Sequence, residues 1–209
     1  MIGFYDYTVL LTYMSFFTSF LGIILAFEDK IFYAILCLMF SGLCDMFDGR
    51  VARTKKKRTN DERSFGMQID SLADLVGFGV LPAVIGYNLG LNKYFVPLLF
   101  FFALAALIRL AYFNMLEINR NSKNPVKEYT GLPVTSSALI FPFIYMFRSM
   151  LGNYFMYLYA GILLLVGCLF ISRIKIKKPS IKMMIGFILI GVVEIILIVI
   201  IRRLIWNIL

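Results

Sequence analysis

The sequence predicts an all-α, polytopic integral membrane helix bundle, and three observations lead to that prediction. Of the 209 residues, 61% are hydrophobic and only 16% are charged, and the mean hydropathy is +0.85. Soluble domains are rarely so apolar. Apolar runs of about 20 residues, the length that crosses a bilayer as a helix, recur along the chain. The charged residues gather between these runs. We therefore expect a single membrane-embedded domain over residues 1–209.

Seven apolar runs qualify as membrane spans. The first is expected to be retained, because residues 1–11 lack the positive segment and the small-residue cleavage site of a secretory signal. The second run is short and the third contains carboxylates, so these two are the least ordinary. The expected spans are 8–27, 31–47, 67–90, 94–116, 132–150, 153–171 and 181–201.

The positive charges predict the orientation of these spans. If the N-terminus is cytoplasmic, the cytoplasmic connections are 48–66, 117–131 and 172–180, and with their flanks they hold 15 of the 21 Lys and Arg residues. Such an excess marks the cytoplasmic side. We expect a multi-pass protein of the cytoplasmic membrane. The basic residues lie next to the membrane, which suits lipid headgroups and phosphorylated substrates and argues against nucleic-acid binding.

Several kinds of chemistry are excluded by composition. The chain has no histidine, which removes Ser-His-Asp catalysis and His-ligated zinc. The three cysteines, Cys37, Cys44 and Cys168, show no pairing pattern for a disulfide or a zinc site. Acid–base or metal chemistry must therefore use carboxylates.

Four aspartates near the cytoplasmic side form the candidate site. Asp45 and Asp48 are three residues apart at the end of the second span, and Asp70 and Asp74 are four apart in the third. These spacings place each pair on one helix face. The two spans are joined on the cytoplasmic side, so we expect the four carboxylates to converge there.

Four carboxylates cannot share a partly desolvated site unless cations or protons neutralise them. All-oxygen ligands suit Mg²⁺ or Mn²⁺, with Ca²⁺ as a further candidate, and two such ions could hold a pyrophosphate. Gly49 and Gly66 would let the backbone approach a ligand. The alternative is that the aspartates cap helix ends at the interface. That suits Asp48 but not Asp74, which lies seven residues inside its span.

These residues resemble the signature of the CDP-alcohol phosphatidyltransferases. The pattern is Asp45-x-x-Asp48-Gly49-x-x-Ala52-Arg53, followed by Gly66-x-x-x-Asp70-x-x-x-Asp74, and it fixes eight residue types. One departure is the spacer between Arg53 and Gly66, which has twelve residues where the family usually has eight. We expect the four additional residues to lengthen a polar cytoplasmic loop.

The resemblance implies a six-span core, so the span at 181–201 is expected to be an addition. It also implies a homodimer that moves a phosphatidyl group from a CDP-linked lipid to an alcohol and releases CMP. By the same resemblance, the aspartates would hold two divalent cations, and Asp74 would take the proton of the attacking hydroxyl. Gly49, Ala52, Arg53 and Gly66 would bind the nucleotide part of the CDP-lipid, with Arg53 on the diphosphate.

Three further blocks resemble the phosphatidylserine synthase branch and imply L-serine as the acceptor and CDP-diacylglycerol as the donor. They are residues 65–83, with Gly77 where the branch usually has serine, residues 109–114, with Tyr112 where arginine is usual, and residues 131–138. Arg109 is also a candidate on its position, about 10 Å from the cytoplasmic edge at the rise of a helix. A membrane-embedded arginine needs a partner, either an acceptor's anionic group or an aspartate. Asn114 and Tyr129 are further acceptor-binding candidates.

Two other functions stay open. The same chemistry could use a different acceptor, such as glycerol 3-phosphate or an inositol phosphate. A small cation transporter is the other alternative, but its ionisable groups should be spread through the membrane depth, and Glu194 is the only other deep acid. Glu194 could lie at a helix-packing or dimer interface, or face a protein-lined cavity.

Overall fold

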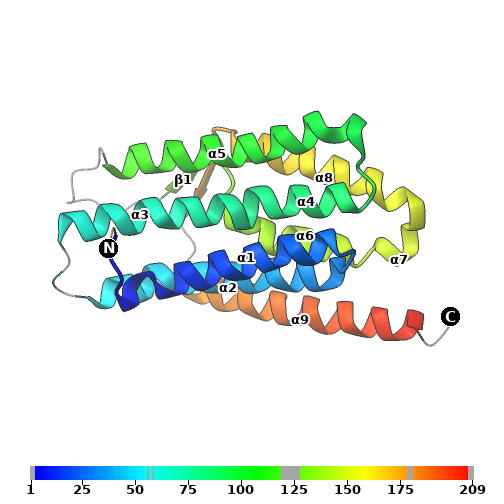
Figure 1. The fold of residues 1–209 in the computed structure, drawn as a ribbon, viewed down its shortest axis with the longest axis horizontal. Coiled ribbons are helices and arrows are strands. Elements are labelled where there is room, and N and C mark those ends of the chain that lie inside the picture. The colour runs from blue at the N-terminus through cyan, green and yellow to red at the C-terminus, as the bar shows by residue number, and fades with distance from the viewer. Residues whose placement is uncertain (1–2, 56, 58, 119–127, 178–180, 207–209) are drawn as a thin grey trace.

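The protein is an elongated helical bundle in which the helices run side by side along the long axis (Figure 1). This computed structural model describes the chain except for residues 1–2, 56, 58, 119–127, 178–180 and 207–209. The segment before the first α-helix and the C-terminal end of the last helix lie at opposite ends of the bundle (Figure 1).

Helices account for nearly all of the regular structure. Two three-residue strands pair antiparallel, with Tyr129 opposite Ile176. Short 3-10 turns precede several helices. The elements are α1 (Leu10–Phe27), α2 (Ile31–Thr54), α3 (Asn60–Asp74), a π-helix (Leu75–Val80), α4 (Leu81–Asn88), α5 (Val96–Ile118), β1 (Glu128–Thr130), α6 (Ser137–Tyr145), α7 (Arg148–Leu151), α8 (Phe155–Phe170), β2 (Lys175–Lys177) and α9 (Ile181–Trp206).

Six of the seven expected spans correspond to helical runs long and apolar enough to cross a membrane. The exception is the span expected at 132–150, which is a shorter apolar helix over Val134–Tyr145. Pro133 has an extended backbone, with ψ of 135°, and delays the start of this helix. The chain then turns before α7 begins at Arg148. All-α architecture is therefore confirmed, with one span shorter than predicted.

The polar segment after Arg53 is largely helical, so the prediction of a lengthened loop was wrong. Helix α2 continues to Thr54, and α3 already begins at Asn60. A capping box stabilises this early start: Glu62 N donates to Thr59 Oγ1 at 3.1 Å, and Thr59 N donates to Glu62 Oε2 at 2.9 Å. Gly66 consequently lies within α3.

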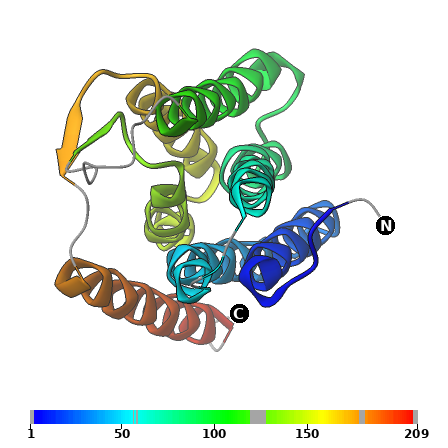
Figure 2. The ribbon, with the colours of Figure 1, turned by 90° about the vertical axis from the view of Figure 1, so that its left-hand side faces the viewer.

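The core is built around aromatic side chains between α5, α6 and α8. Phe102 packs edge-on against Phe141, with ring centroids 5.6 Å apart, and both are fully buried. The Tyr159 hydroxyl, also fully buried, donates to the Pro82 carbonyl at 2.9 Å and ties α8 to α4. Helix α9 packs on α2 and α6 at one side of the bundle (Figure 2). Glu194 is buried on α9, one turn from Gly191, which approaches Leu139 of α6. This position favours the packing interpretation of Glu194.

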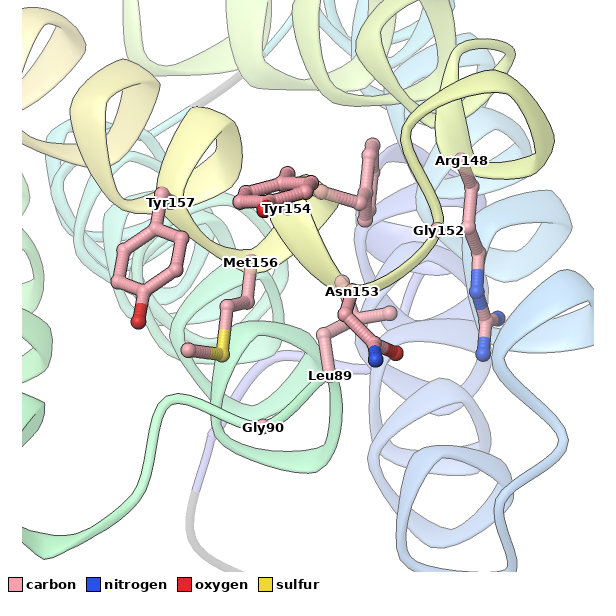
Figure 3. A pocket seen from close by; sticks show the side chains of 9 residues that line it. Leu89, Gly90, Arg148, Gly152, Asn153, Tyr154, Met156 and Tyr157 are labelled. Carbon is pink, nitrogen blue, oxygen red and sulfur yellow. The ribbon is translucent and has the colours of Figure 1, made fainter.

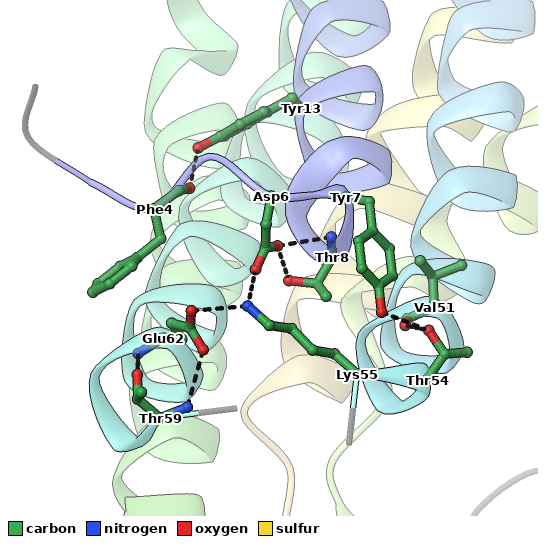
Figure 4. A network of polar contacts seen from close by, with 10 residues as sticks. All are labelled: Phe4, Asp6, Tyr7, Thr8, Tyr13, Val51, Thr54, Lys55, Thr59 and Glu62. Atoms are coloured by element: carbon green, nitrogen blue, oxygen red, sulfur yellow. Dashed lines mark hydrogen bonds and ion pairs between the residues drawn. The ribbon is translucent and has the colours of Figure 1, made fainter. Parts of the chain in front are cut away.

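A charged network joins the N-terminal segment to the α2–α3 connection (Figure 4). Lys55 Nζ lies 2.6 Å from Asp6 Oδ2 and 2.8 Å from Glu62 Oε1. The Asp6 carboxylate also accepts hydrogen bonds from the backbone and side chain of Thr8. The hydrogen bond from Lys55 is the main cause that lowers the pKa of Asp6 to about 2. Since this pKa lies below the ordinary value, the pair stabilises the fold above about pH 4 and weakens only as the pH falls toward 2.

We predict that Lys55→Met lowers the thermal unfolding temperature of the protein at neutral pH, because it removes two partly exposed ion pairs. Thermal unfolding in detergent, with and without added salt, measures the effect. The matched control is Lys57→Met, because Lys57 is exposed and close in sequence. Equal stability of the two variants at low salt would contradict the role given to Lys55.

Candidate active site

Carboxylates from α2 and α3 meet inside the bundle. One oxygen each of Asp45, Asp70 and Asp74 lies within 4.8 Å of the others, and among the described residues these three form the group that could hold a metal ion. Asp48 lies next to them, because its carboxyl is within hydrogen-bonding reach of Asp70. The carboxyl of Asp45 likewise reaches that of Asp74. The structure thus brings together all four predicted aspartates.

The carboxylates of this cluster repel one another strongly when all of them are ionised. Asp48 and Asp74 are only 7% and 8% exposed. Two unit charges about 5 Å apart in a partly buried site repel by about 3 kcal/mol. Cations or protons must offset this repulsion for each pair. The donor set is entirely oxygen, which fits Mg²⁺, Mn²⁺ or Ca²⁺ and does not fit a thiolate- or imidazole-dependent metal. The acidic cluster therefore matches the divalent cations that the resemblance implies.

Helix α1 supplies a contact that the sequence analysis did not identify. Thr12 Oγ1 donates to Asp48 Oδ2 at 3.3 Å, and Thr12 is 4% exposed. Ser15 and Ser19 lie on the same face of α1 and are also buried. A polar stripe at spacings of three and four in an otherwise apolar helix was the signal that could have identified this face.

The predicted nucleotide-binding residues lie on the same helices. Arg53 is exposed, and its Nε donates to the Gly49 carbonyl at 2.8 Å, one turn earlier on α2. A side chain at Gly49 would meet only the Arg53 guanidinium within 4 Å among the described atoms, so packing inside the protein does not require glycine there. Ala52 and Gly66 are half-buried on α2 and α3. Gly49 thus leaves space beside the arginine.

Of the three predicted acceptor-binding residues, two adjoin the carboxylates. The positive charge of Arg109, half-buried on α5, acts on Asp45. Asn114 is buried on α5, and its Oδ1 accepts a hydrogen bond from Ser71 Oγ at 2.9 Å. Ser71 directly follows Asp70, a relation the sequence analysis missed. Tyr129 lies in β1, and its side chain falls outside the described part of the chain.

Two surface depressions differ in their relation to this cluster. A groove of about 390 Å³ between α3 and α5 is lined by Asn114, Gln68 and apolar side chains. It passes beside the hydrogen bond from Ser71. A second pocket, of about 610 Å³, lies at the opposite end of the bundle and contains Arg148 and Asn153 but no carboxylate (Figure 3). The groove includes the candidate residue Asn114, whereas this pocket includes none of the candidate site residues.

Comparison with known proteins identifies the family. The family model for CDP-alcohol phosphatidyltransferase matches residues 8–172. The chain belongs to this family. The match contains every predicted site residue and ends before α9, so α9 lies outside the part that the family model describes.

Curated relatives indicate which branch of the family the chain resembles. The chain is 32% identical to a CDP-diacylglycerol–serine O-phosphatidyltransferase of Helicobacter pylori, over 82% of this chain and 71% of the relative. A protein of the same name from Saccharomyces cerevisiae is 41% identical over 52% of this chain and only 40% of its own length. An archaetidylserine synthase of Methanothermobacter thermautotrophicus is 30% identical over 81% of this chain and 68% of its own. The resemblance to the phosphatidylserine synthase branch is therefore confirmed.

We predict that Ser71→Ala destabilises the protein by about 1–3 kcal/mol, because it leaves the buried Asn114 oxygen without its donor. Denaturant or thermal unfolding in detergent measures this loss. Ser64→Ala is the matched control, since Ser64 is exposed on the same helix. A loss no larger than that of the control would show that the α3–α5 hydrogen bond contributes little.

Proposed function

We propose that this chain catalyses phospholipid biosynthesis by moving the phosphatidyl group of CDP-diacylglycerol to the hydroxyl of L-serine, which yields phosphatidylserine and CMP. The observation that carries the proposal is the convergence of the motif aspartates, with oxygens of three of them within 4.8 Å. The family match supports the phosphatidyl transfer. Relatives named for serine, matched over four fifths of this chain, support the acceptor.

The proposed cofactors are two divalent cations, Mg²⁺ or Mn²⁺ with Ca²⁺ as a further candidate, held by Asp45, Asp48, Asp70 and Asp74. When bound, such ions offset the charge of the aspartates and of a diphosphate. Arg53 would add a positive charge toward that diphosphate, and its guanidinium is exposed beside Gly49. Gly49, Ala52 and Gly66 would leave room for the nucleotide part of the CDP-lipid.

Asp74 is the proposed general base. It would take the proton of the serine hydroxyl while that oxygen attacks the lipid-side phosphorus and CMP leaves. Its burial between α2 and α3 keeps water away from this step. Arg109 would face the serine carboxylate, Asn114 would position the acceptor from α5, and Tyr129 is a further acceptor-binding residue.

The proposed setting is the cytoplasmic membrane, with the active site facing the cytoplasm. The connection between α2 and α3 lies at the end of the bundle that also holds the C-terminus of α5 (Figure 1), and both adjoin expected cytoplasmic segments. Membrane lipids are the expected surroundings, and a homodimer is the proposed assembly. Residues 1–209 would form one domain. Nucleic acid is not a proposed partner.

The likeness to an archaetidylserine synthase favours a second candidate donor. In that case the CDP-linked lipid would carry the ether chains of archaeol, and the acceptor would still be serine. The site described above handles the diphosphate and the hydroxyl, and it does not depend on how the chains are linked to glycerol.

The test is CMP release by the purified protein with Mn²⁺ or Mg²⁺. CDP-diacylglycerol and CDP-archaeol are compared as donors, and serine, glycerol 3-phosphate, inositol and inositol 1-phosphate as acceptors. We expect release with serine alone, and a loss of at least about 100-fold in Asp74→Asn, the lower range for removing a general base. Asp61→Asn is the control, since Asp61 is exposed at the start of the same helix.

Other outcomes have defined meanings. Release with a phosphorylated alcohol and not with serine would overturn the serine assignment and leave the transfer chemistry intact. Failure to release CMP with any acceptor, in folded and metal-loaded protein, would contradict the proposed activity and favour the transport alternative.

A further inference from the structure

A cluster of three buried hydroxyls lies one helical turn from the aspartates. Ser15 Oγ and Ser41 Oγ are 2.7 Å apart, and Ser19 Oγ is 2.9 Å from Ser41 Oγ and 2.8 Å from the Ser15 carbonyl oxygen. All three residues are at most 2% exposed. Ser41 precedes Asp45 by four residues on α2, so the two lie on the same face. The hydroxyls are satisfied by one another and by the backbone, and the proposed chemistry does not use them.

This cluster contacts the only π-helix in the described part of the chain, which begins directly after Asp74. A Cβ placed on Gly77 would lie 2.7 Å from Ser19 Oγ, which is closer than side chains tolerate, and 3.0 Å from Ser41 Oγ, which is a tight contact. Turning the fully buried Ser19 side chain away would break its two hydrogen bonds. Gly77 is therefore required by its contact with the two hydroxyls.

The contact lies within one helical turn of Asp74. Gly77 follows Asp74 by three residues in a continuous helical run. Phe78, which is also about one turn from Asp74, is fully buried and lies toward Gly42 of α2, the helix that carries Asp45. A shift of the π-helix against α1 and α2 would therefore move the Asp74 carboxylate.

The sequence explains why the wider turn forms here. Pro82 has no N–H to donate to the Phe78 carbonyl, which would be its partner in an α-helix. Ser137 Oγ of α6 approaches that carbonyl at 3.3 Å instead. Contacts from α1, α2 and α6 therefore hold the π-helix in place.

We propose that Ser19, Ser41 and Gly77 are positioning residues for Asp74. The close contact between Gly77 and the two hydroxyls fixes the position of the π-helix against α1 and α2, and this places Asp74, which lies three residues before Gly77. The inference rests on the proposed function insofar as Asp74 is the base, but the orientation of Asp74 also determines metal binding.

The test compares Gly77→Ala, Ser19→Ala and the double variant Gly77→Ala/Ser19→Ala. In the double variant the 2.7 Å clash disappears, because the two Cβ atoms would lie 3.6 Å apart. Gly161→Ala is the matched control, since a Cβ there meets nothing within 4 Å. For each variant we would measure Mn²⁺ binding by electron paramagnetic resonance, the thermal unfolding temperature, and kcat and KM for serine.

We expect Gly77→Ala to weaken Mn²⁺ binding and to lower kcat by about 10-fold or more, the effect of displacing a group that orients metal ligands, with a smaller change in KM. The double variant should recover most of both losses. The inference is overturned if folded Gly77→Ala binds Mn²⁺ as the wild type does, or if the double variant binds no better than Gly77→Ala.

A second variant keeps the test decisive if Gly77→Ala does not fold. Ser41→Ala introduces no clash and removes the hydroxyl shared by Ser15 and Ser19. Weaker Mn²⁺ binding in this variant supports the inference, and unchanged binding overturns it. Because Mn²⁺ binding needs no substrate, a wild type that is inactive with serine would refute the proposed function without deciding the positioning role.

Discussion

The repulsion among buried carboxylates is the constraint on which the rest of this structure depends. Oxygens of Asp45, Asp70 and Asp74 come within 4.8 Å, and Asp48 and Asp74 are almost completely buried. Such a site is stable only when cations or protons neutralise it, and the charge of Arg109 acts on Asp45 from α5. The surrounding contacts oppose the tendency of α2 and α3 to separate.

Those contacts come from every side of the two aspartate-bearing helices. The Lys55 network closes the connection between them, Thr12 donates to Asp48 from α1, and Ser71 bonds to Asn114 on α5. Each is a polar contact that joins one of these helices, or their connection, to a neighbouring segment. In a membrane, apolar surface gains little by leaving lipid for a neighbouring helix, so specific hydrogen bonds and close packing have a larger share in fixing the arrangement.

The sequence was sufficient for features that depend on local spacing. Apolar runs predicted six of the spans, and the spacing of Asp45, Asp48, Asp70 and Asp74 predicted their convergence. It was insufficient where tertiary contacts decide the result. The twelve-residue spacer after Arg53 suggested a longer polar loop, but the capping box at Thr59 starts α3 already at Asn60. Thr12 and Ser71 were missed because only the folded bundle brings them to partners far along the chain.

The most direct test of the central claim, that divalent cations neutralise the joined carboxylates, is a Mn²⁺ titration of the substrate-free protein followed by electron paramagnetic resonance and thermal unfolding. The account predicts saturable binding of two ions per chain, accompanied by a rise in unfolding temperature. Asp70→Asn should lose both effects, while Asp61→Asn, at an exposed position on the same helix, should retain them. Binding that is equally strong in Asp70→Asn, or no saturable binding by the wild type, would contradict the account.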